Sequence, residues 1–242
     1  MSDRATMSVV LHGESGVGKS WLGDTAPKPL LTLDIEGRAK HTPSGPKITW
    51  DPRTESPPEP PSQENPWETC VVSVTDYRVL DTVYGWLRSG QHPFRAVNVD
   101  SLMEFQKRVI DTVAGREQMK TQDWGTVLRE LESFVRKLRD LLTYDEAHLD
   151  LVVIITGSIA DGTGRQRPLL QGQLKNTLPY FVDVVGYLFT QPVEGGGYQR
   201  ALQVAPTPWA VAKDGTDRLG GPTIAAPDLT TLYGQLQNGK DA

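Results

Sequence analysis

The chain has 242 residues, 38% of them hydrophobic, which is enough apolar material for one α/β domain with a buried core. Its formal net charge of −5 excludes a surface that is basic throughout, so any nucleic-acid contact has to be confined to particular loops or to one face. Cys70 is the only cysteine, which excludes an intramolecular disulfide and fits a reducing, cytoplasmic setting. No apolar run approaches the roughly 18 residues of a membrane span, so we expect no membrane partner.

Strands and helices are predicted to alternate through the first two thirds of the chain. Short apolar runs predict strands at residues 8–12, 29–35, 69–75, 94–100 and 150–156. Apolar residues at helical spacing predict a helix that begins at Lys19 and further helices at residues 76–88, 102–113 and 126–142. Such alternation is typical of a mostly parallel sheet with helices on both faces.

The last third of the chain has a different pattern. Residues 157–177 are polar and contain several glycines, which predicts a loop. Residues 181–190 and 199–205 predict two strands around a turn at Gly195–Gly197, and residues 227–236 predict a closing helix. The expected fold class is therefore α/β, with a mostly parallel central sheet flanked by helices, an antiparallel hairpin at one edge, and one domain over residues 1–242.

Residues 42–68 differ in composition from the rest of the chain. They hold eight prolines together with Ser, Glu and Asn, which predicts an exposed, extended insertion. Two interpretations remain open: a surface loop that the fold tolerates, or a segment that docks a partner.

The segment between the first predicted strand and the next helix matches the phosphate-binding pattern G-x-x-x-x-G-K-[ST] in full. Its residues are Gly13, Glu14, Ser15, Gly16, Val17, Gly18, Lys19 and Ser20. Glycines let backbone N–H groups surround a phosphate, and the helix N-terminus adds a favourable dipole. We therefore expect ATP or a close purine nucleoside triphosphate, with Lys19 on the β- and γ-phosphates and the Ser20 hydroxyl on Mg²⁺.

Two acidic residues at strand ends are candidates for the rest of the site. Asp100 ends a predicted strand and can hold the Mg²⁺ shell through water, although Asp100 and Ser101 could instead cap the next helix. Hydrolysis also needs a carboxylate that orients water, and no glutamate follows Asp100. Glu36 follows the second predicted strand and would lie beside the γ-phosphate if that strand neighboured the first. The alternative is an ordinary charged strand end.

The residues leave three classes of function open. The chain has no N-K-x-D motif, which argues against a GTPase. The first possibility is an ATPase. The second is a phosphotransferase that acts on a small substrate, with Arg165 and Arg167 as its lid. The third is a nucleotide-switched binding protein with little turnover.

The phosphate loop, the segment Leu33-Asp34-Ile35-Glu36-Gly37 and the pair Asp100–Ser101 together resemble the RecA-like core ATPases. The resemblance is closest to a small phage-encoded group that carries only the ATPase core and acts in single-strand annealing and recombination. It covers most of the chain, except residues 42–68. It implies ATP hydrolysis with Mg²⁺, a homo-oligomeric ring or filament with ATP at subunit interfaces, and binding to single-stranded DNA. It also implies a single-strand-binding protein as a possible partner, and the cytoplasm of a bacterial host as the location.

The same resemblance implies roles for later residues. The strand that ends at Thr156 corresponds to one that ends in a nucleotide-sensing Gln or His in the family, whereas this chain has Thr156 and Ser158. Residues 178–188 resemble the strand after the family's second DNA-binding loop. Lys213 and Arg218 resemble a basic element that reaches the ATP of the neighbouring subunit, where it would stabilise the transferring phosphoryl group. The alternative is that both are solvated cations.

Basic and aromatic residues in two polar stretches are the candidates for DNA contact. Residues 157–177 correspond to the second DNA-binding loop of the family, and residues 115–125 would be the first. A tryptophan in the first stretch could stack on a base or could instead anchor the start of the next helix. The candidates are Arg116, Lys120 and Trp124 in residues 115–125, and Arg165, Arg167 and Lys175 in residues 157–177.

Overall fold

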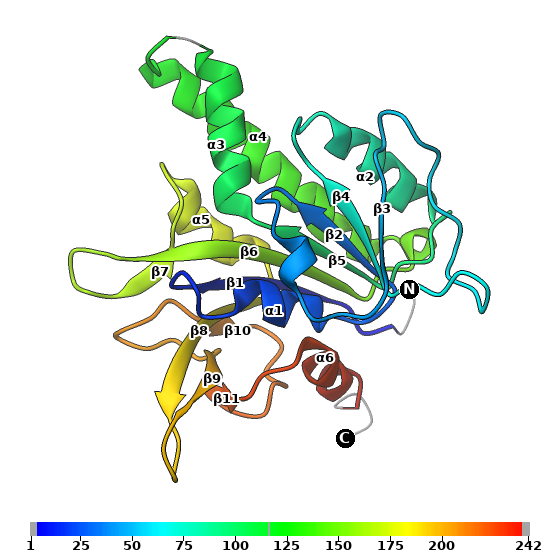
Figure 1. The fold of residues 1–242 in the computed structure, drawn as a ribbon. Helices are drawn as coiled ribbons and strands as arrows, with labels where there is room; N and C mark the ends of the chain where they lie inside the picture. Colours follow the sequence, from blue (N-terminus) through cyan, green and yellow to red (C-terminus); the bar gives the residue numbers. More distant parts are fainter. Residues whose placement is uncertain (1–3, 116, 239–242) are drawn as a thin grey trace.

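A mixed β-sheet forms the centre of the computed structural model, which describes residues 4–115 and 117–238 (Figure 1). Across the sheet the strands follow the order β11-β9-β8-β1-β6-β5-β2-β4-β3, while β10 pairs with β8 and β7 pairs with β6. The strands are β1 (Met7–Gly13), β2 (Leu30–Asp34), β3 (Lys47–Thr49), β4 (Thr69–Ser73), β5 (Ala96–Asp100), β6 (Leu151–Ala160), β7 (Gln166–Pro168), β8 (Val184–Pro192), β9 (Tyr198–Gln203), β10 (Lys213–Asp214) and β11 (Thr223–Ala225).

The strands from β8 to β3 in this order all run parallel to one another. At the other edge, β8 pairs with β9 and β9 with β11 in antiparallel fashion. Strands β1, β2 and β5 are buried along their whole length, because helices cover both faces of the sheet. The predicted α/β fold, with a mostly parallel sheet and an antiparallel hairpin at one edge, is confirmed.

Helices cover the two faces of the sheet unequally. Four helices, α2 to α5, pack on one face around a core that includes Phe94, Phe105 and Leu131, and α3 and α4 lie against each other and extend beyond the sheet (Figure 1). On the other face, α1 and α6 enclose a second core around Leu22 and Leu232. None of the helices described is long and apolar enough to cross a membrane. The helices are α1 (Lys19–Asp24), α2 (Val79–Ser89), α3 (Leu102–Ala114), α4 (Thr121–Asp140), α5 (Leu174–Phe181) and α6 (Leu229–Asn238), with 3₁₀ turns at Ala39–His41, Leu141–Thr143 and Asp145–Ala147.

Three predicted segments had wrong boundaries. Helix α4 begins at Thr121 rather than at residue 126, because the Asp123 carboxylate accepts a hydrogen bond of 2.7 Å from the Lys120 backbone N–H and caps an earlier first turn. Residues 157–177 do not form one loop: β6 continues to Ala160, pairs with β7 as a hairpin, and α5 follows from Leu174. The strand predicted from residue 178 or 181 therefore begins only at Val184, as β8.

The proline-rich insertion is attached to the fold at both of its ends. Strand β3 lies within it and pairs in parallel with β4 at the edge of the sheet. Trp50 and Trp67 are only 4% and 3% exposed, and both belong to the larger core. The prediction of an exposed segment holds for residues 53–57 and 62–66. It was wrong for the two ends, where tryptophans have enough apolar surface to be buried beside the sheet.

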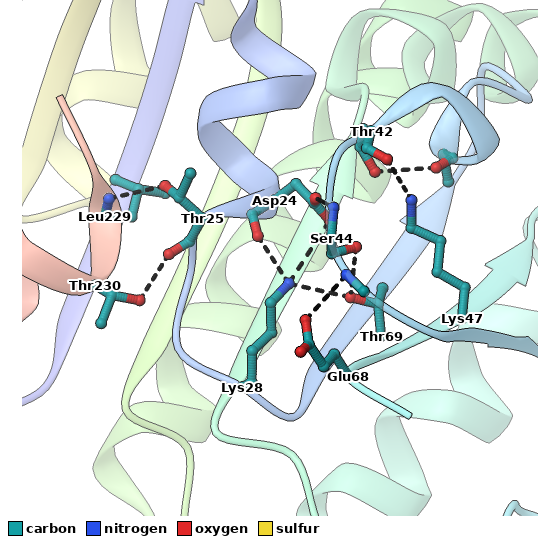
Figure 2. A network of polar contacts seen from close by, with 12 residues as sticks. Asp24, Thr25, Lys28, Thr42, Ser44, Lys47, Glu68, Thr69, Leu229 and Thr230 are labelled. Atoms are coloured by element: carbon teal, nitrogen blue, oxygen red, sulfur yellow. Dashed lines mark hydrogen bonds and ion pairs between the residues drawn. The ribbon is translucent and has the colours of Figure 1, made fainter. Parts of the chain in front are cut away.

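A polar network ties the start of this insertion to the C-terminal end of α1 (Figure 2). The Asp24 carboxylate accepts a hydrogen bond of 2.6 Å from the Ser44 backbone N–H and lies 3.7 Å from the Lys28 ammonium. Lys28 also donates to the Thr69 hydroxyl in β4 at 3.1 Å, and the first backbone N–H of α6 donates to the Thr25 hydroxyl at 2.9 Å. The helix that follows the phosphate loop is thus fixed to the insertion, to β4 and to α6.

Candidate nucleotide-binding site

The phosphate loop lies at the carboxyl end of β1, where the chain turns into α1. Gly16 and Gly18 have positive φ angles of 82° and 101°, which only glycine adopts without strain. A Cβ atom on Gly13 would lie 2.4 Å from the Leu188 carbonyl oxygen, and one on Gly18 would lie 2.3 Å from the Arg200 Nε. Backbone conformation and the close approach of Leu188 in β8 and of Arg200 therefore require glycine at these positions, and such a glycine-rich loop lets backbone N–H groups surround a phosphate.

Lys19 reaches back across this loop. Its Nζ donates hydrogen bonds to the carbonyl oxygens of Gly13 at 2.9 Å and Glu14 at 2.7 Å. Burial lowers the pKa of Lys19, while the nearby carboxylates of Asp100 and Glu36 oppose that shift. The ammonium therefore lies close to the loop and to both acidic residues, where the oxygens of a phosphate would be well placed to pair with its charge.

Asp100 ends β5 and approaches the phosphate loop from across one strand, because β6 lies between β1 and β5. Burial raises the pKa of Asp100 to about 6, the hydroxyl of Ser20 lowers it, and the carboxylate of Glu36 raises it. The alternative role, a helix cap, falls to its neighbour: the Ser101 side chain accepts a hydrogen bond from the Glu104 backbone N–H at the start of α3. Asp100 is therefore left free to act in the cavity.

A hydroxyl beside a carboxylate provides the hard oxygen donors that Mg²⁺ prefers. Within residues 4–115 and 117–238, no cluster of three or more His, Cys, Asp or Glu side chains could hold a metal. The oxygen donors of Ser20 and Asp100 fit a Mg²⁺ ion that would arrive with a nucleotide and take its remaining ligands from phosphate and water.

Glu36 reaches the site by a different route from the one expected. Strand β2 does not neighbour β1; it lies beyond β5, with Asp34 in register with Asp100. The backbone N–H groups of Ile35 and Glu36 donate to the Asp100 carbonyl oxygen at 2.7 and 3.2 Å. The Ser101 hydroxyl donates to Glu36 Oε1. The premise that β2 neighbours β1 was wrong, but the parallel register of β2 and β5 still brings Glu36 beside Asp100.

Asp34 and Arg38 are two residues of the site that the sequence patterns did not single out. The buried Asp34 carboxylate accepts hydrogen bonds from the backbone N–H groups of Gly37, Arg38 and Ala39 at 2.8, 3.0 and 3.1 Å. Arg38 then places its Nε 3.4 Å from Glu36 Oε2. An aspartate three residues before a glycine is typical of such a side-chain-capped turn, and that spacing was the available signal.

One cavity of about 380 Å³ is lined by Lys19, Ser20, Glu36, Arg38 and Asp100 together. Thr156 lies on its wall at the position expected for nucleotide sensing, and its hydroxyl donates to the Leu169 carbonyl oxygen at 3.2 Å. The cavity is lined by Ser15, Gly16, Gly18, Lys19, Ser20, Trp21, Glu36, Arg38, His41, Thr42, Asp100, Ser101, Met103, Ile155, Thr156, Gly157, Ser158 and Leu169.

A family model described as AAA domain matches residues 5–216 of the chain. The chain belongs to this family. AAA domains have a fold of the P-loop NTPase type and are generally ATPases, so the protein is a nucleotide-binding domain of the ATPase type, usually dependent on Mg²⁺. Comparison with curated proteins gave no match.

The candidate DNA contacts of this AAA domain lie outside the cavity lining. Arg165 and Arg167 are half-buried on the β6–β7 hairpin; Arg165 donates to the Ala210 carbonyl oxygen at 3.3 Å, and Arg167 lies 3.7 Å from Asp161. Trp124 is 36% exposed in the first turn of α4 and lines a shallow hollow with residues 171–173. The two predicted DNA stretches therefore meet at Trp124.

Two of the remaining basic candidates lie at or in helices. Lys120 precedes α4 and pairs with Glu117 at 2.9 Å, whereas Lys175 belongs to α5 rather than to a flexible loop. Arg116 lies outside the described residues.

The two cations expected to act on a neighbouring subunit differ in their surroundings. Lys213 turns into its own domain, where Nζ donates to the carbonyl oxygens of Pro179 at 3.2 Å and Val182 at 2.6 Å. Arg218 is exposed on a turn that the Asp214 carboxylate holds through several backbone N–H groups, and its guanidinium donates a long hydrogen bond, of 3.4 Å, to the Leu236 carbonyl oxygen in α6. The geometry favours Arg218 over Lys213 for any contact with a second subunit.

Proposed function

We propose that this AAA domain is a Mg²⁺-dependent ATPase of the RecA-like type that assembles into a homo-oligomer and acts on single-stranded DNA in phage recombination, replication or repair. The observation that carries the ATPase part is the convergence of Lys19, Ser20, Asp100 and Glu36 on one cavity at the carboxyl ends of β1, β5 and β2. Ligand sites at this edge of a parallel sheet are the general rule in α/β folds.

Each of these side chains has a role that its position supports. The loop N–H groups and Lys19 would bind the phosphates, and Ser20 with Asp100 would hold Mg²⁺, which offsets negative charge on the phosphate oxygens. Glu36 would orient a water for attack on the γ-phosphorus and take up its proton as the bond to the β–γ bridging oxygen breaks. The products are ADP and inorganic phosphate.

DNA binding would use the surface around Trp124. The hollow at Trp124 joins an exposed aromatic face to residues 171–173, and base stacking on such a face is tolerant of sequence. Arg165 and Arg167 add positive charge on the adjoining hairpin. With an acidic chain overall, useful affinity for DNA would require several subunits to bind together.

The positions of Arg165 and Arg167 give the phosphotransferase alternative less support than the ATPase. Arg165 and Arg167 make contacts within their own part of the fold and do not line the cavity. A nucleotide-switched binding protein would share the same cavity, and turnover separates it from an ATPase.

The test is ATP hydrolysis with Mg²⁺, with and without a single-stranded oligonucleotide. We expect DNA to stimulate hydrolysis, and Glu36→Gln to lower turnover by about 10²- to 10⁴-fold while ATP still binds. Glu59→Gln, an exposed glutamate in the insertion, is the matched control and should behave as the wild type. Unchanged turnover in Glu36→Gln would contradict the assigned role. ATP binding without any hydrolysis would favour the nucleotide switch, and hydrolysis that ignores DNA would remove the DNA part.

A further inference from the structure

Both carboxylate oxygens of Glu36 have partners in this structure. Ser101 donates its hydroxyl to Oε1, and the Arg38 guanidinium Nε lies 3.4 Å from Oε2. A carboxylate that is to orient a water must have an oxygen available to accept a hydrogen bond from it. Each carboxylate oxygen can accept two hydrogen bonds, so a water can reach Oε2 as well, but it has to compete there with the Arg38 guanidinium.

Of the two contacts to Glu36, the ion pair with Arg38 is the easier one to break. Its side chain is 65% exposed, and an exposed ion pair of this kind contributes only about 0–1 kcal/mol. Its backbone, by contrast, is fixed by the N–H contacts to the Asp34 carboxylate. A fixed backbone that bears a mobile guanidinium can move its charge by rotation about side-chain bonds alone.

Arg38 also lies on the phosphate side of the site. It lines the same cavity as Lys19 and Ser20, and its positive charge contributes to lowering the pKa of Lys19. The carboxylates of Asp100 and Glu36 line the same cavity, so the two cations would bind a phosphate whose Mg²⁺ offsets those negative charges. A guanidinium presents paired N–H donors that match the oxygens of a phosphate.

We propose that Arg38 is a γ-phosphate-binding residue of its own subunit, which leaves Glu36 when ATP binds and thereby frees Glu36 Oε2 for the attacking water. This inference rests on the proposed function, since it needs a nucleoside triphosphate in the cavity. It distinguishes ATP from ADP, because ADP has no γ-phosphate to draw Arg38 away. With ADP, or with no nucleotide, the Arg38 guanidinium stays beside Glu36 Oε2 and competes with a water there.

The experiment measures the Kd of Mg²⁺–AMP-PNP and of Mg²⁺–ADP for wild type, Arg38→Ala and Arg38→Lys by calorimetry. We expect Arg38→Ala to weaken AMP-PNP binding by about 10- to 100-fold and to leave ADP binding within about 2-fold, since only the triphosphate loses a charged contact. Arg38→Lys should bind AMP-PNP with an affinity between those of the wild type and Arg38→Ala. Arg78→Ala is the matched control, because Arg78 pairs with Asp76, also two residues before it, and is 81% exposed.

The outcomes separate this inference from the proposed function. AMP-PNP binding that is equal in wild type and Arg38→Ala, or an equal loss for both nucleotides, would overturn the role of Arg38 and leave nucleotide binding intact. Failure of the wild type to bind either nucleotide would remove the proposed function itself. Lys19→Ala should weaken the binding of both nucleotides, and it shows how a general loss of nucleotide binding looks in this measurement.

Discussion

His12 is the last side chain of β1 before the phosphate loop, and its surroundings keep it neutral. It is 0% exposed, with Nε2 2.7 Å from the Val211 carbonyl oxygen and Nδ1 3.2 Å from the Ser158 hydroxyl. A carbonyl can only accept, so Nε2 carries the hydrogen, and Nδ1 lies beside the Ser158 hydroxyl, which also lies within hydrogen-bond distance of Gln166 Oε1 and the Arg167 carbonyl oxygen. Burial lowers the pKa of His12 to about 4, the contact with Val211 opposes this, and the charge of Lys19 adds to the lowering.

This depressed pKa predicts that stability falls in mild acid. The unfolded chain takes up a proton near the ordinary histidine pKa of about 6.5, whereas the folded chain resists it down to about 4, so the stability is full above the first value and is lost below it. Between pH 7 and pH 5 the contribution of His12 is a loss of about 2 kcal/mol. Urea denaturation at both pH values should show a smaller loss for His12→Gln than for the wild type.

The control for this comparison is His41→Gln, which replaces an exposed histidine. It should keep the wild-type pH dependence, because an exposed ring is hydrated in both the folded and the unfolded chain. If His12→Gln lost as much stability between pH 7 and pH 5 as the wild type, another group would be responsible. His92 would be the next candidate, because burial lowers its pKa as well.

At the scale of residues, local spacing was informative where function depends on consecutive positions. The eight residues of the phosphate loop, Asp100 and Glu36 could be selected from motif and strand ends alone. Asp34 had a signal in its spacing to Gly37, but Arg38 and the contacts of Lys213 with its own domain could not be selected, because they depend on where a turn directs a side chain and on which carbonyl groups a distant segment presents.

Among the elements, the proline-rich insertion differs most from its prediction, because tryptophans near both of its ends are buried in the larger core. Trp67 packs against Phe94, with ring centroids 5.9 Å apart, inside the larger core. Trp67→Ala should therefore lower the free energy of unfolding by about 3–5 kcal/mol, since it leaves a cavity that the neighbouring strands cannot fill. Trp209→Ala is the matched control and should lose much less, because Trp209 is 43% exposed. Urea denaturation followed by circular dichroism measures both, and equal losses would contradict the anchoring role.

The patterns that failed at this scale were short or mixed. Composition alone placed residues 42–68 outside the fold, because proline and charge outweigh two tryptophans in such a count. Strands β3, β7, β10 and β11 are two or three residues long, which is too short for an alternation to be recognised. Residues 178–181 have strand-like composition, yet Leu174 and Leu178 are buried on one side of α5, so tertiary packing selects a helix.

At the scale of the whole molecule, the class of fold was predictable but the order of its strands was not. Alternating elements indicate a parallel sheet, whereas strand order depends on contacts between residues far apart in the chain. The placement of β6 between β1 and β5, and of β5 between β6 and β2, is what brings Asp100 and Glu36 to the phosphate loop together. No periodicity in a single sequence encodes that order.

The proposed assembly can be tested by mixing two inactive variants. If ATP lies at the interface and Arg218 acts on the neighbouring subunit, Arg218→Ala should bind ATP but hydrolyse it poorly, by about 10³-fold or more. Glu36→Gln fails in its own site yet still presents a normal Arg218. In an equal mixture, about a quarter of the sites would combine an intact Glu36 with an intact neighbouring Arg218, so hydrolysis should recover to about that fraction of the wild-type rate.

Lys213→Ala serves as the contrast, because its ammonium contacts its own domain and its loss should not be rescued by mixing. Recovery close to zero in the mixture of Arg218→Ala and Glu36→Gln, with ATP-dependent oligomers still seen by light scattering, would mean that the residue acting across the interface is not Arg218.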